Sequence, residues 1–248
     1  AVGLTYAATE RALLFGAEAV DLAERSDDAG ALASALGQHG RVLWQAGVVD
    51  EQLRVAERLL DLVEQPRSGV DPQRWALAGL VGLAIRACGR SAYGRVDECA
   101  ADIRRALELA RRHRLAGAVS QLLWAEVGIA TGRGDIAGAR ELAVSAVQQT
   151  ERTQLYQRES YSMVTASEID RRLGRLAVWH PVILAIGDSV GLHTGWMGVE
   201  ALLQGGQTNL ARQRAETVAD AVSGPHWTGW LACSCVQARV VADLADQV

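Results

Sequence analysis

The fold is decided by the stretch Gly94-Arg95-Val96-Asp97-Glu98-Cys99, together with Ile103 and Ala106 further along the chain. It joins a glycine to a run in which small and apolar residues recur at steps of three and four, the period of an amphipathic helix. A second stretch, Gly134-Asp135-Ile136-Ala137-Gly138-Ala139, has the same form and is followed by Ala146. Because glycine accepts the left-handed conformation in which many helices end, each stretch predicts a turn between two helices.

The glycine recurs along the chain at intervals of 47, 40, 40 and 32 residues. Its five positions are Gly47, Gly94, Gly134, Gly174 and Gly206. A unit of about 40 residues that holds two helices cannot bury its apolar face alone, so successive units must stack. The sequence therefore predicts an all-α fold, an α-α superhelix (solenoid) of about six antiparallel helix pairs.

The helical period continues over nearly the whole chain, whereas the period-two alternation of strands is nearly absent. The twelve expected helices are 7–25, 28–46, 49–65, 72–89, 95–113, 115–131, 135–152, 154–173, 176–187, 191–204, 207–222 and 226–246. No linker long enough to separate two domains interrupts them, so we expect one continuous repeat domain over residues 1–248. Steps of 40 residues outward from the outermost glycines fall near both ends of the chain, which favours a fragment of a longer protein, truncated within the array at both ends.

Polar residues stand where several second helices are expected to begin, and each can accept hydrogen bonds from free backbone N–H groups as an N-cap. These residues are Asp50, Asp97, Asp135 and Asn209. Two positions depart from the pattern, because Gln52 and Trp179 stand where a small residue is expected. We expect Pro181 either to kink the short helix 176–187 or to lie in its first turn.

Composition is that of an ordinary globular protein, with 49% hydrophobic residues, 22% charged residues and a net charge of −4. The longest strongly apolar stretch, residues 76–85, is far shorter than the roughly 20 residues of a membrane span. We therefore expect a cytoplasmic protein that binds neither membrane nor, through this segment, nucleic acid. All 25 basic residues are arginine, which excludes the P-loop, protein-kinase and Schiff-base classes, since each needs a lysine.

The sequence gives no support for catalysis, for a cofactor or for a metal. The five histidines lack the spacing of metal ligands, and no nucleophile elbow or dinucleotide-binding glycine loop is present. They are His39, His113, His180, His193 and His226. We expect the four cysteines, Cys88, Cys99, Cys233 and Cys235, to be buried reduced thiols. The prediction is a protein that is not an enzyme.

The two quoted stretches resemble the second helix of a tetratricopeptide repeat, and Trp124-Ala125-Glu126-Val127-Gly128 is similar to the opening of its first helix. The resemblance implies that the first helices of the pairs line a concave groove. Aromatic and arginine residues are the usual anchors of a binding groove. The candidates on these helices are Trp44, Trp75, Trp124, Tyr156, Arg158, Tyr161, Trp196 and Trp230. The alternative, that individual tryptophans fill gaps between helices, stays open.

The arginine-rich, lysine-free helix pairs also resemble the C-terminal repeat region of large actinobacterial transcriptional regulators. These are the Streptomyces antibiotic regulatory proteins and the LuxR-type large ATP-binding regulators. The stretches that carry the resemblance are residues 19–28 and 172–177. It implies a sensor or effector domain of a cytoplasmic activator of secondary-metabolite genes. Its partners would be a protein, peptide or small-molecule effector in the groove and the other domains of the parent protein. The alternative is an interaction scaffold of another signalling protein, such as a nucleotide cyclase or a signalling ATPase.

Overall fold

The fold was analysed in a computed structural model, which describes residues 9–26, 28–65, 71–153, 166–167, 169–182 and 195–222. Within these ranges the regular elements are helices, and no strand occurs among them. The all-α architecture predicted from the sequence is confirmed. Contacts divide the chain into two compact units, residues 1–162 and 163–248. Each unit is described by itself, and the expectation of one domain over residues 1–248 stays a prediction.

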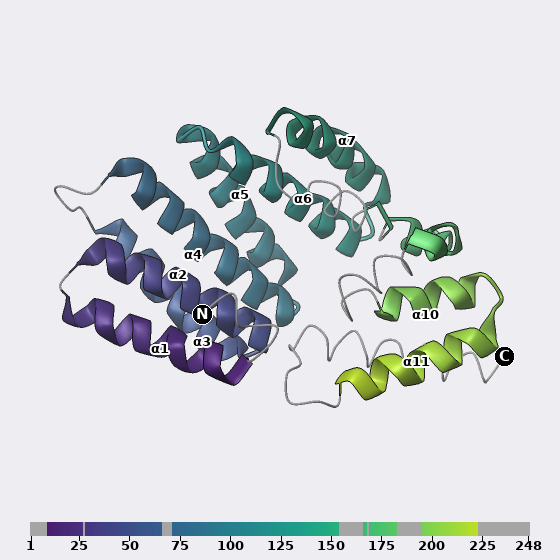
Figure 1. Cartoon of the computed structure of the whole chain (residues 1–248). Helices are drawn as coiled ribbons and strands as arrows, with labels where there is room; N and C mark the ends of the chain where they lie inside the picture. The colour runs from purple at the N-terminus through teal and green to yellow at the C-terminus, as the bar shows by residue number, and fades with distance from the viewer. Residues whose placement is uncertain are drawn as a thin grey trace. The chain divides into compact units, whose positions relative to one another are not determined.

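The described part of the first unit consists of α-helices that pack in chain order, each against the next (Figure 1). They are α1 (Thr9–Arg25), α2 (Ala29–Ala46), α3 (Val49–Glu64), α4 (Pro72–Ala92), α5 (Val96–Arg112), α6 (Ala116–Gly132) and α7 (Ile136–Thr153). The pairs α2–α3, α4–α5 and α6–α7 are the predicted antiparallel units, and α2 also contacts α4 directly. The seven predicted helices 7–25 to 135–152 agree with these bounds to within three residues.

The described part of the second unit contains a 3-10 turn, η2 (Leu176–Trp179), and the helices α10 (Gly195–Gln204) and α11 (Thr208–Val222). Pro181 lies in the first turn of helical residues 180–182, as one of the two expectations has it. Trp179, at a position expected to be small, packs against a cluster of Leu176, Met197 and Ala201. Its indole N–H donates to the Asp170 carboxylate over 2.8 Å.

Four predicted helices of the second half are described in part or not at all. Of the predicted helix 154–173, residues 166–167 and 169–173 are described, and all of them are helical except Leu173, which lies in the turn that follows. Of the predicted helix 191–204, residues 195–204 are described and form α10. The helix predicted over 176–187 differs from the structure in that its first four residues form the tighter 3-10 turn η2. The helix predicted over 226–246 lies outside the described residues.

All five signature glycines adopt the left-handed conformation, with φ between 69° and 78°. At each of them the residue after the glycine donates its backbone N–H to the carbonyl five positions earlier, over 2.8 to 3.0 Å. This bond closes the end of the first helix and starts the second in the antiparallel direction. Arg114, with φ of 56°, occupies the corresponding place between α5 and α6. The repeated turn is therefore a real structural unit of the array.

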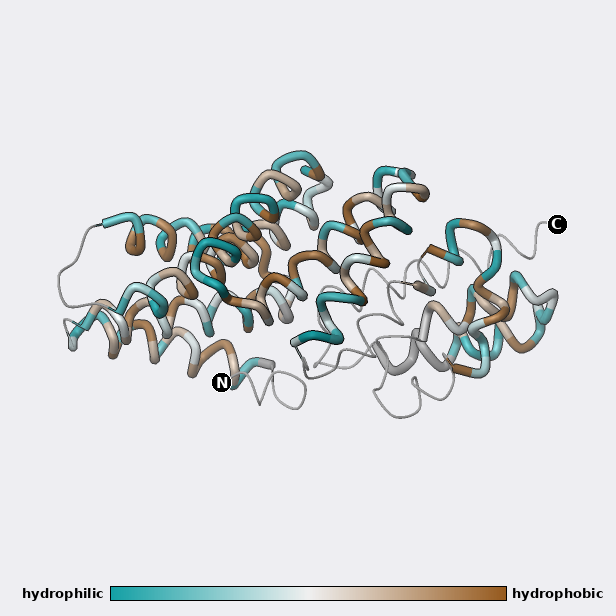
Figure 2. Tube along the Cα trace, turned by 90° about the horizontal axis from the view of Figure 1, so that it is seen from above, coloured by the Kyte–Doolittle hydropathy of each residue, from teal (hydrophilic) through white to brown (hydrophobic). Residues whose placement is uncertain are grey.

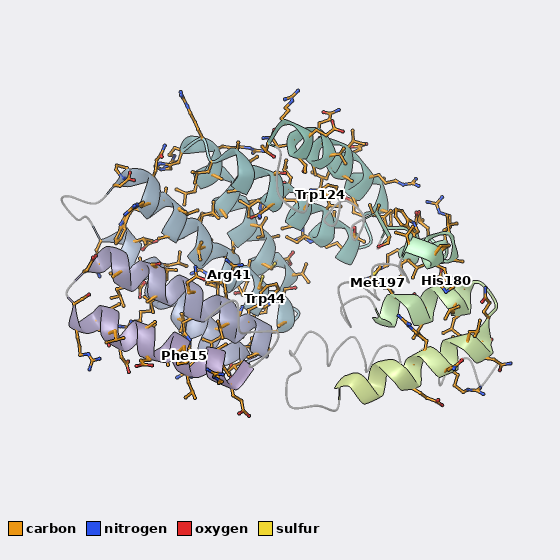
Figure 3. The ribbon with its side chains drawn as sticks, viewed as in Figure 1. Phe15, Arg41, Trp44, Trp124, His180 and Met197 are labelled. Atoms are coloured by element: carbon orange, nitrogen blue, oxygen red, sulfur yellow. The ribbon has the colours of Figure 1, made fainter. Side chains whose placement is uncertain are left out.

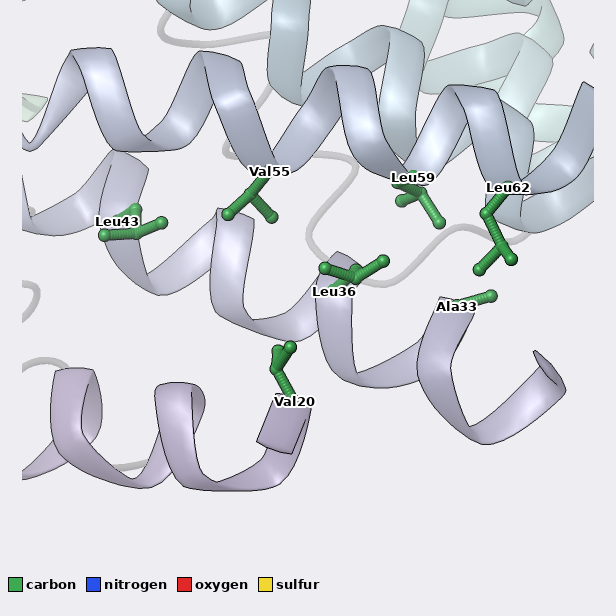
Figure 4. Close-up of a cluster of buried hydrophobic side chains, with 7 residues drawn as sticks. All are labelled: Val20, Ala33, Leu36, Leu43, Val55, Leu59 and Leu62. Carbon is green, nitrogen blue, oxygen red and sulfur yellow. The ribbon is translucent and has the colours of Figure 1, made fainter. Parts of the chain in front are cut away.

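Apolar side chains point between the helices and form the core of the first unit. A cluster from α1, α2 and α3 joins Val20, Ala33, Leu36, Leu43, Val55, Leu59 and Leu62 (Figure 4). Along the helices of Figure 2 the hydrophobic positions alternate with hydrophilic ones at the helical period, which is the pattern of amphipathic helices. The burial of these stripes against neighbouring helices is what holds the stack together.

Helix α3 lies close against α4 because α4 carries glycines where the two helices meet. A side chain at Gly82 would meet Leu60 at 3.0 Å, and one at Gly89 would meet Leu53 at 2.7 Å. Gln52, the residue expected to be small, is 1% exposed at this contact. Gly89 on α4 lies beside the Gln52 amide. Because Gly89 has no side chain, the larger Gln52 fits at a position where the repeat pattern expects a small residue.

Two of the predicted N-caps are wrong. Helices α3 and α5 begin after Val48 and Arg95, and neither has a side-chain cap. Asp50 instead accepts a hydrogen bond from the Tyr93 hydroxyl, and Asp97 pairs with Arg133. Both aspartates lie inside the first helical turn, from which the side chain projects toward the next repeat rather than back over the free N–H groups.

The other two predicted N-caps have different outcomes. Asp135 immediately precedes α7 and accepts a hydrogen bond from the Gly138 N–H at 2.9 Å, so this cap is confirmed. Asn209 is the second residue of α11 and therefore lies within the helix rather than before it. The position before the helix, where an N-cap stands, belongs to Gln207.

Candidate functional site

A cleft of about 670 Å³ lies between α2 and α4, the first helices of two successive pairs. We call it the inner cleft. Its α2 wall consists of Gly30, Ala31, Ala33, Ser34, Gly37 and Gln38, and its α4 wall consists of Arg74, Trp75, Leu77, Ala78 and Val81. Five of the six residues of the α2 wall are very small, whereas Arg74, Trp75 and Leu77 on the α4 wall are large. The space between the walls is what the small residues leave open.

The inner cleft closes where the two helices approach most closely. A side chain at Gly37 would meet Val81 at 3.1 Å, and one at Gly40 would collide with Ile85. Toward their N-termini the same helices leave room for the cleft. The cleft is therefore closed where Gly37 and Gly40 bring α2 against α4, and it is open toward the N-termini of the two helices, where Trp75 lies.

The open end of the inner cleft carries charge. Asp28 caps α2 by accepting hydrogen bonds from the N–H groups of Gly30 at 2.8 Å and Ala31 at 3.1 Å. Asp71 caps α4 by accepting from the Gln73 N–H at 3.0 Å. The capping bonds hold both carboxylates at the mouth, which Arg74 also lines. An apolar slot with two fixed carboxylates and one guanidinium can orient a ligand that carries both an apolar and a polar part.

A second cleft of about 490 Å³, which we call the outer cleft, lies between α3, α4 and α5. Its walls carry charges of both signs, among them Glu108, Arg112 and His113. Arg105 of α5 and Glu64 of α3 form an ion pair of 2.9 Å and both line this cleft. Trp75 lines both clefts, so the two spaces lie on either side of this one residue.

The three predicted site residues whose side chains the structure describes, Trp44, Trp75 and Trp124, do not share a cleft. Trp75 lines the inner cleft, whereas Trp44 is exposed near the C-terminal end of α2 and does not line either cleft (Figure 3). Trp196 belongs to α10, but its side chain is outside what the structure describes. Four candidates lie outside the described residues altogether: Tyr156, Arg158, Tyr161 and Trp230.

Trp124 is an interior residue of the α6–α7 pair, 5% exposed. Its indole N–H donates to the Thr150 hydroxyl over 3.1 Å, and that hydroxyl is 2.6 Å from the hydroxyl of Ser120. Thr150 in turn donates to the Ala146 carbonyl at 2.7 Å. The indole therefore fills the space between two helices and satisfies its one polar group there, as the gap-filling alternative expects.

Sequence reasoning missed the small-residue wall that makes the inner cleft. Gly30 and Gly37 are seven residues apart on α2, with Ala33 and Ser34 between them, so they share one face of the helix. That spacing was readable from the sequence. What was not readable is that this face lies opposite Trp75, because the partner of a helix face depends on how the repeats stack.

A buried ionic cluster joins α4 to α5. Asp102 accepts from Arg86 Nη2 at 2.7 Å and Arg86 Nε at 3.1 Å, and from Arg90 Nη1 at 2.7 Å. These hydrogen bonds raise the pKa of Arg86 above its ordinary value. Because all three charged side chains face one another within a helix pair, the cluster holds α4 and α5 together.

The two described cysteines are unpaired thiols, and Cys99 is buried as expected whereas Cys88 is partly exposed. Burial raises the pKa of Cys88 to about 11, and burial also raises the pKa of Cys99. A thiol with a raised pKa stays protonated at neutral pH, and the protonated form is neither nucleophile nor metal ligand. Cys233 and Cys235 lie outside the described residues. Among the described residues no group of His, Cys, Asp and Glu is placed to hold a metal ion.

The chain matches no family model, and it matches no curated protein. It is similar to a solved structure, the crystal structure of BtubC (BKLC) from P. vanneervenii, with a TM-score of 0.57. The likeness covers 85% of this chain and 89% of that chain at 17% sequence identity. At this identity it shows a common helical fold alone. None of the described helices has both the length and the hydropathy of a membrane span.

Proposed function

We propose that this chain is a non-enzymatic binding module whose inner cleft receives an apolar group of a partner peptide or small-molecule effector. The observation that supports the proposal is the slot between α2 and α4, in which Trp75 faces a wall of glycine, alanine and serine. Its volume is within the range of about 300 to 1,000 Å³ that small-molecule sites occupy. A partly buried indole over a small-residue wall favours a flat aromatic or branched aliphatic group.

The charges at the mouth favour a ligand with a positive group. Asp28 and Asp71 supply two carboxylates and Arg74 one guanidinium, and the two carboxylates are already oriented by their capping bonds. These polar groups are not arranged as a nucleophile beside a base, so the cleft suits binding rather than conversion of the ligand. An aromatic or aliphatic side chain next to an amine or guanidinium is the ligand chemistry that fits.

The biological role that we propose is that of a sensor or effector domain in a cytoplasmic transcriptional activator of secondary-metabolite genes. This part rests on the sequence resemblance of residues 19–28 and 172–177 to large actinobacterial regulators. A ligand in the inner cleft would shift the parent protein between two states only if it bound one of them more tightly. The cleft lies between two repeats. A change in the spacing of α2 and α4 would therefore alter the contacts that the ligand makes, and so its affinity for each state.

The experiment uses the full chain labelled with 5-fluorotryptophan. The Trp75 resonance is assigned with Trp75→Phe, and fluorine spectra are recorded with a fragment library of aromatic amines and matched aromatic carboxylates. We expect amines to shift the Trp75 resonance more than carboxylates. Ser34→Phe, which fills the cleft from its exposed small wall, should abolish the shift, whereas Ser145→Phe on the exposed face of α7 should leave it unchanged.

Two results would overturn the binding site. One is a library in which no member moves Trp75, and the other is equal binding by the wild-type chain and Ser34→Phe. The regulatory role is tested separately, by introducing Ser34→Phe and Ser145→Phe into the intact parent protein and measuring transcription of its target genes. Equal transcription by the two variants would count against a regulatory role and leave the binding result standing.

A further inference from the structure

Helix α1 presents an apolar face to solvent. Leu14, Phe15 and Leu22 are 69%, 43% and 52% exposed, and Figure 3 shows Phe15 on this helix at the edge of the first unit. Their spacing places them on one side of the helix together with Arg11, Glu18 and Arg25. We call these six residues the outer face of α1. The Arg11 guanidinium lies over the Phe15 ring at 5.8 Å, which covers part of one aromatic side chain.

The repeat register explains why Phe15 and Leu22 on this face are apolar. An offset of 40 residues, the mean repeat, carries Phe15, Ala19 and Leu22 of α1 onto Val55, Leu59 and Leu62 of α3. On α3 those three residues are buried against Ala33, Leu36 and Leu43 of α2, the first helix of the same pair (Figure 4). The residues that α3 uses to bind its own first helix thus have exposed counterparts on α1.

The opposite side of α1 follows the same register and is covered. Gly16 and Val20 correspond to Ala56 and Leu60 of α3. Gly16 packs against His39 of α2, and Leu60 packs against Gly82 of α4, so each contact is with the first helix of the following pair. Helix α1 therefore has both contact faces of a second helix, and in the described structure only one of them is occupied.

We propose that the outer face of α1 is a docking surface for the first helix of a further repeat, packed antiparallel to α1. The surface continues an interface that recurs in the unit, since α3, α5 and α7 each pack against the first helix of their own pair. The helix that fits has apolar residues at steps of three and seven, as α2 has in Ala33, Leu36 and Leu43. This inference is independent of the ligand proposed for the inner cleft.

A second copy of the same face is a poor occupant, because its charges repel one another. Antiparallel pairing of two α1 helices centred on Glu18 brings the two Glu18 residues together and places Arg11 opposite Arg25. Parallel pairing about a two-fold axis brings each charge against its own copy. Like charges across a helix contact destabilise it. An α2-like helix carries almost no charge on its contact face and meets no such repulsion.

The test supplies an α2-like helix to the full chain. Residues 28–47 are joined ahead of Ala1, so that residues 1–8 connect the added helix to α1 and are long enough for a reversal of direction. The control carries the same graft with Leu36→Asp and Leu43→Asp in the added copy. We expect the graft, relative to its control, to raise Tm by about 4 °C or more and to slow hydrogen exchange of the α1 amides at least about tenfold.

A second variant makes the outcome specific to the outer face. Leu22→Ser should lower Tm by less than about 1 °C in the ungrafted chain, where Leu22 is exposed, and by about 3 °C or more in the grafted chain. Equal Tm and equal α1 exchange in the graft and its control would overturn the proposal. An increase in Tm that Leu22→Ser fails to reduce would overturn it as well, because the added helix would then be stabilising the chain elsewhere.

Discussion

The side-chain amide of Gln52 donates a hydrogen bond of 2.7 Å to the main-chain carbonyl of Ile85, 33 residues further along the chain. Gln52 belongs to the second helix of one repeat and Ile85 to the first helix of the next. The bond therefore joins successive repeats at a fully buried point, where Gly89 gives the side chain room. It is one of the contacts that hold α3 against α4.

Gln52→Ala should lower the free energy of unfolding by about 2 to 4 kcal/mol, because it removes a buried hydrogen bond and leaves a cavity. Urea unfolding followed by circular dichroism measures the loss. The matched control is Gln121→Ala, at an exposed position of α6, which should change stability by less than about 0.5 kcal/mol. Equal effects of the two substitutions would show that Gln52 contributes no more than a surface residue.

Gly134→Ala should cost about 1 to 2 kcal/mol, because Gly134 has a φ of 78° and alanine avoids that region. No atom lies within 4 Å of the added methyl group, so the cost is backbone strain alone. Gly132, two residues earlier and the last residue of α6, also leaves an added methyl group in open space. Gly132→Ala should therefore be neutral or stabilise by up to about 1 kcal/mol. Thermal unfolding of both variants measures the difference in sign, and losses of the same size would contradict the turn geometry.

The sequence predicted those parts of the fold that depend on residues close together in the chain. The signature glycines and the helical period report on neighbouring residues, so the turns and the first seven helices were predictable to within three residues. The roles of Asp50 and Asp97 were not, because their partners Tyr93 and Arg133 come from the following repeat. A cap is a local interaction, whereas a bond between repeats depends on how the units stack.

The candidate site shows the same limit more strongly. Trp75 and Trp124 both stand on first helices, and the sequence alone made both of them candidates for the groove. In the structure, Trp75 lines both clefts whereas Trp124 donates to Thr150 inside its own pair. The distinction depends on what lies opposite each ring, a small-residue wall for one and two hydroxyls for the other. A single sequence does not specify those opposite faces.

Asp102→Asn should lower the free energy of unfolding by about 2 to 3 kcal/mol. The substitution keeps the shape of the side chain but leaves Arg86 and Arg90 without their shared carboxylate in a buried position. Arg90 retains Glu98 at 3.4 Å, which limits the loss. The control is Asp97→Asn on the same helix, since the exposed pair of Asp97 with Arg133 should contribute less than about 1 kcal/mol. Chemical denaturation of both variants tests this order, and a larger loss for Asp97→Asn would reverse the assignment.

His39 should make the first unit sensitive to acid. Burial lowers its pKa below the ordinary 6.5, although the charge of Glu51 acts in the opposite direction. Because the folded state disfavours the protonated ring, the stability that His39 contributes is complete above about pH 6.5 and is lost as the pH falls through the lowered pKa. One such group accounts for a slope of at most about 1.4 kcal/mol per pH unit.

Urea unfolding at pH 7.0, 6.0 and 5.5 measures this slope above the range in which most carboxylates titrate. His39→Gln, which keeps a side chain of similar size beside Gly16, should flatten the pH dependence and retain the fold. His113→Gln is the matched control, and it should leave the slope of the wild-type chain in place because His113 lies at the wall of the outer cleft rather than between α1 and α2. If both variants lose stability with the same slope as the wild-type chain, the acid sensitivity originates in groups other than His39, and the contact of its ring with Gly16 carries no pH dependence.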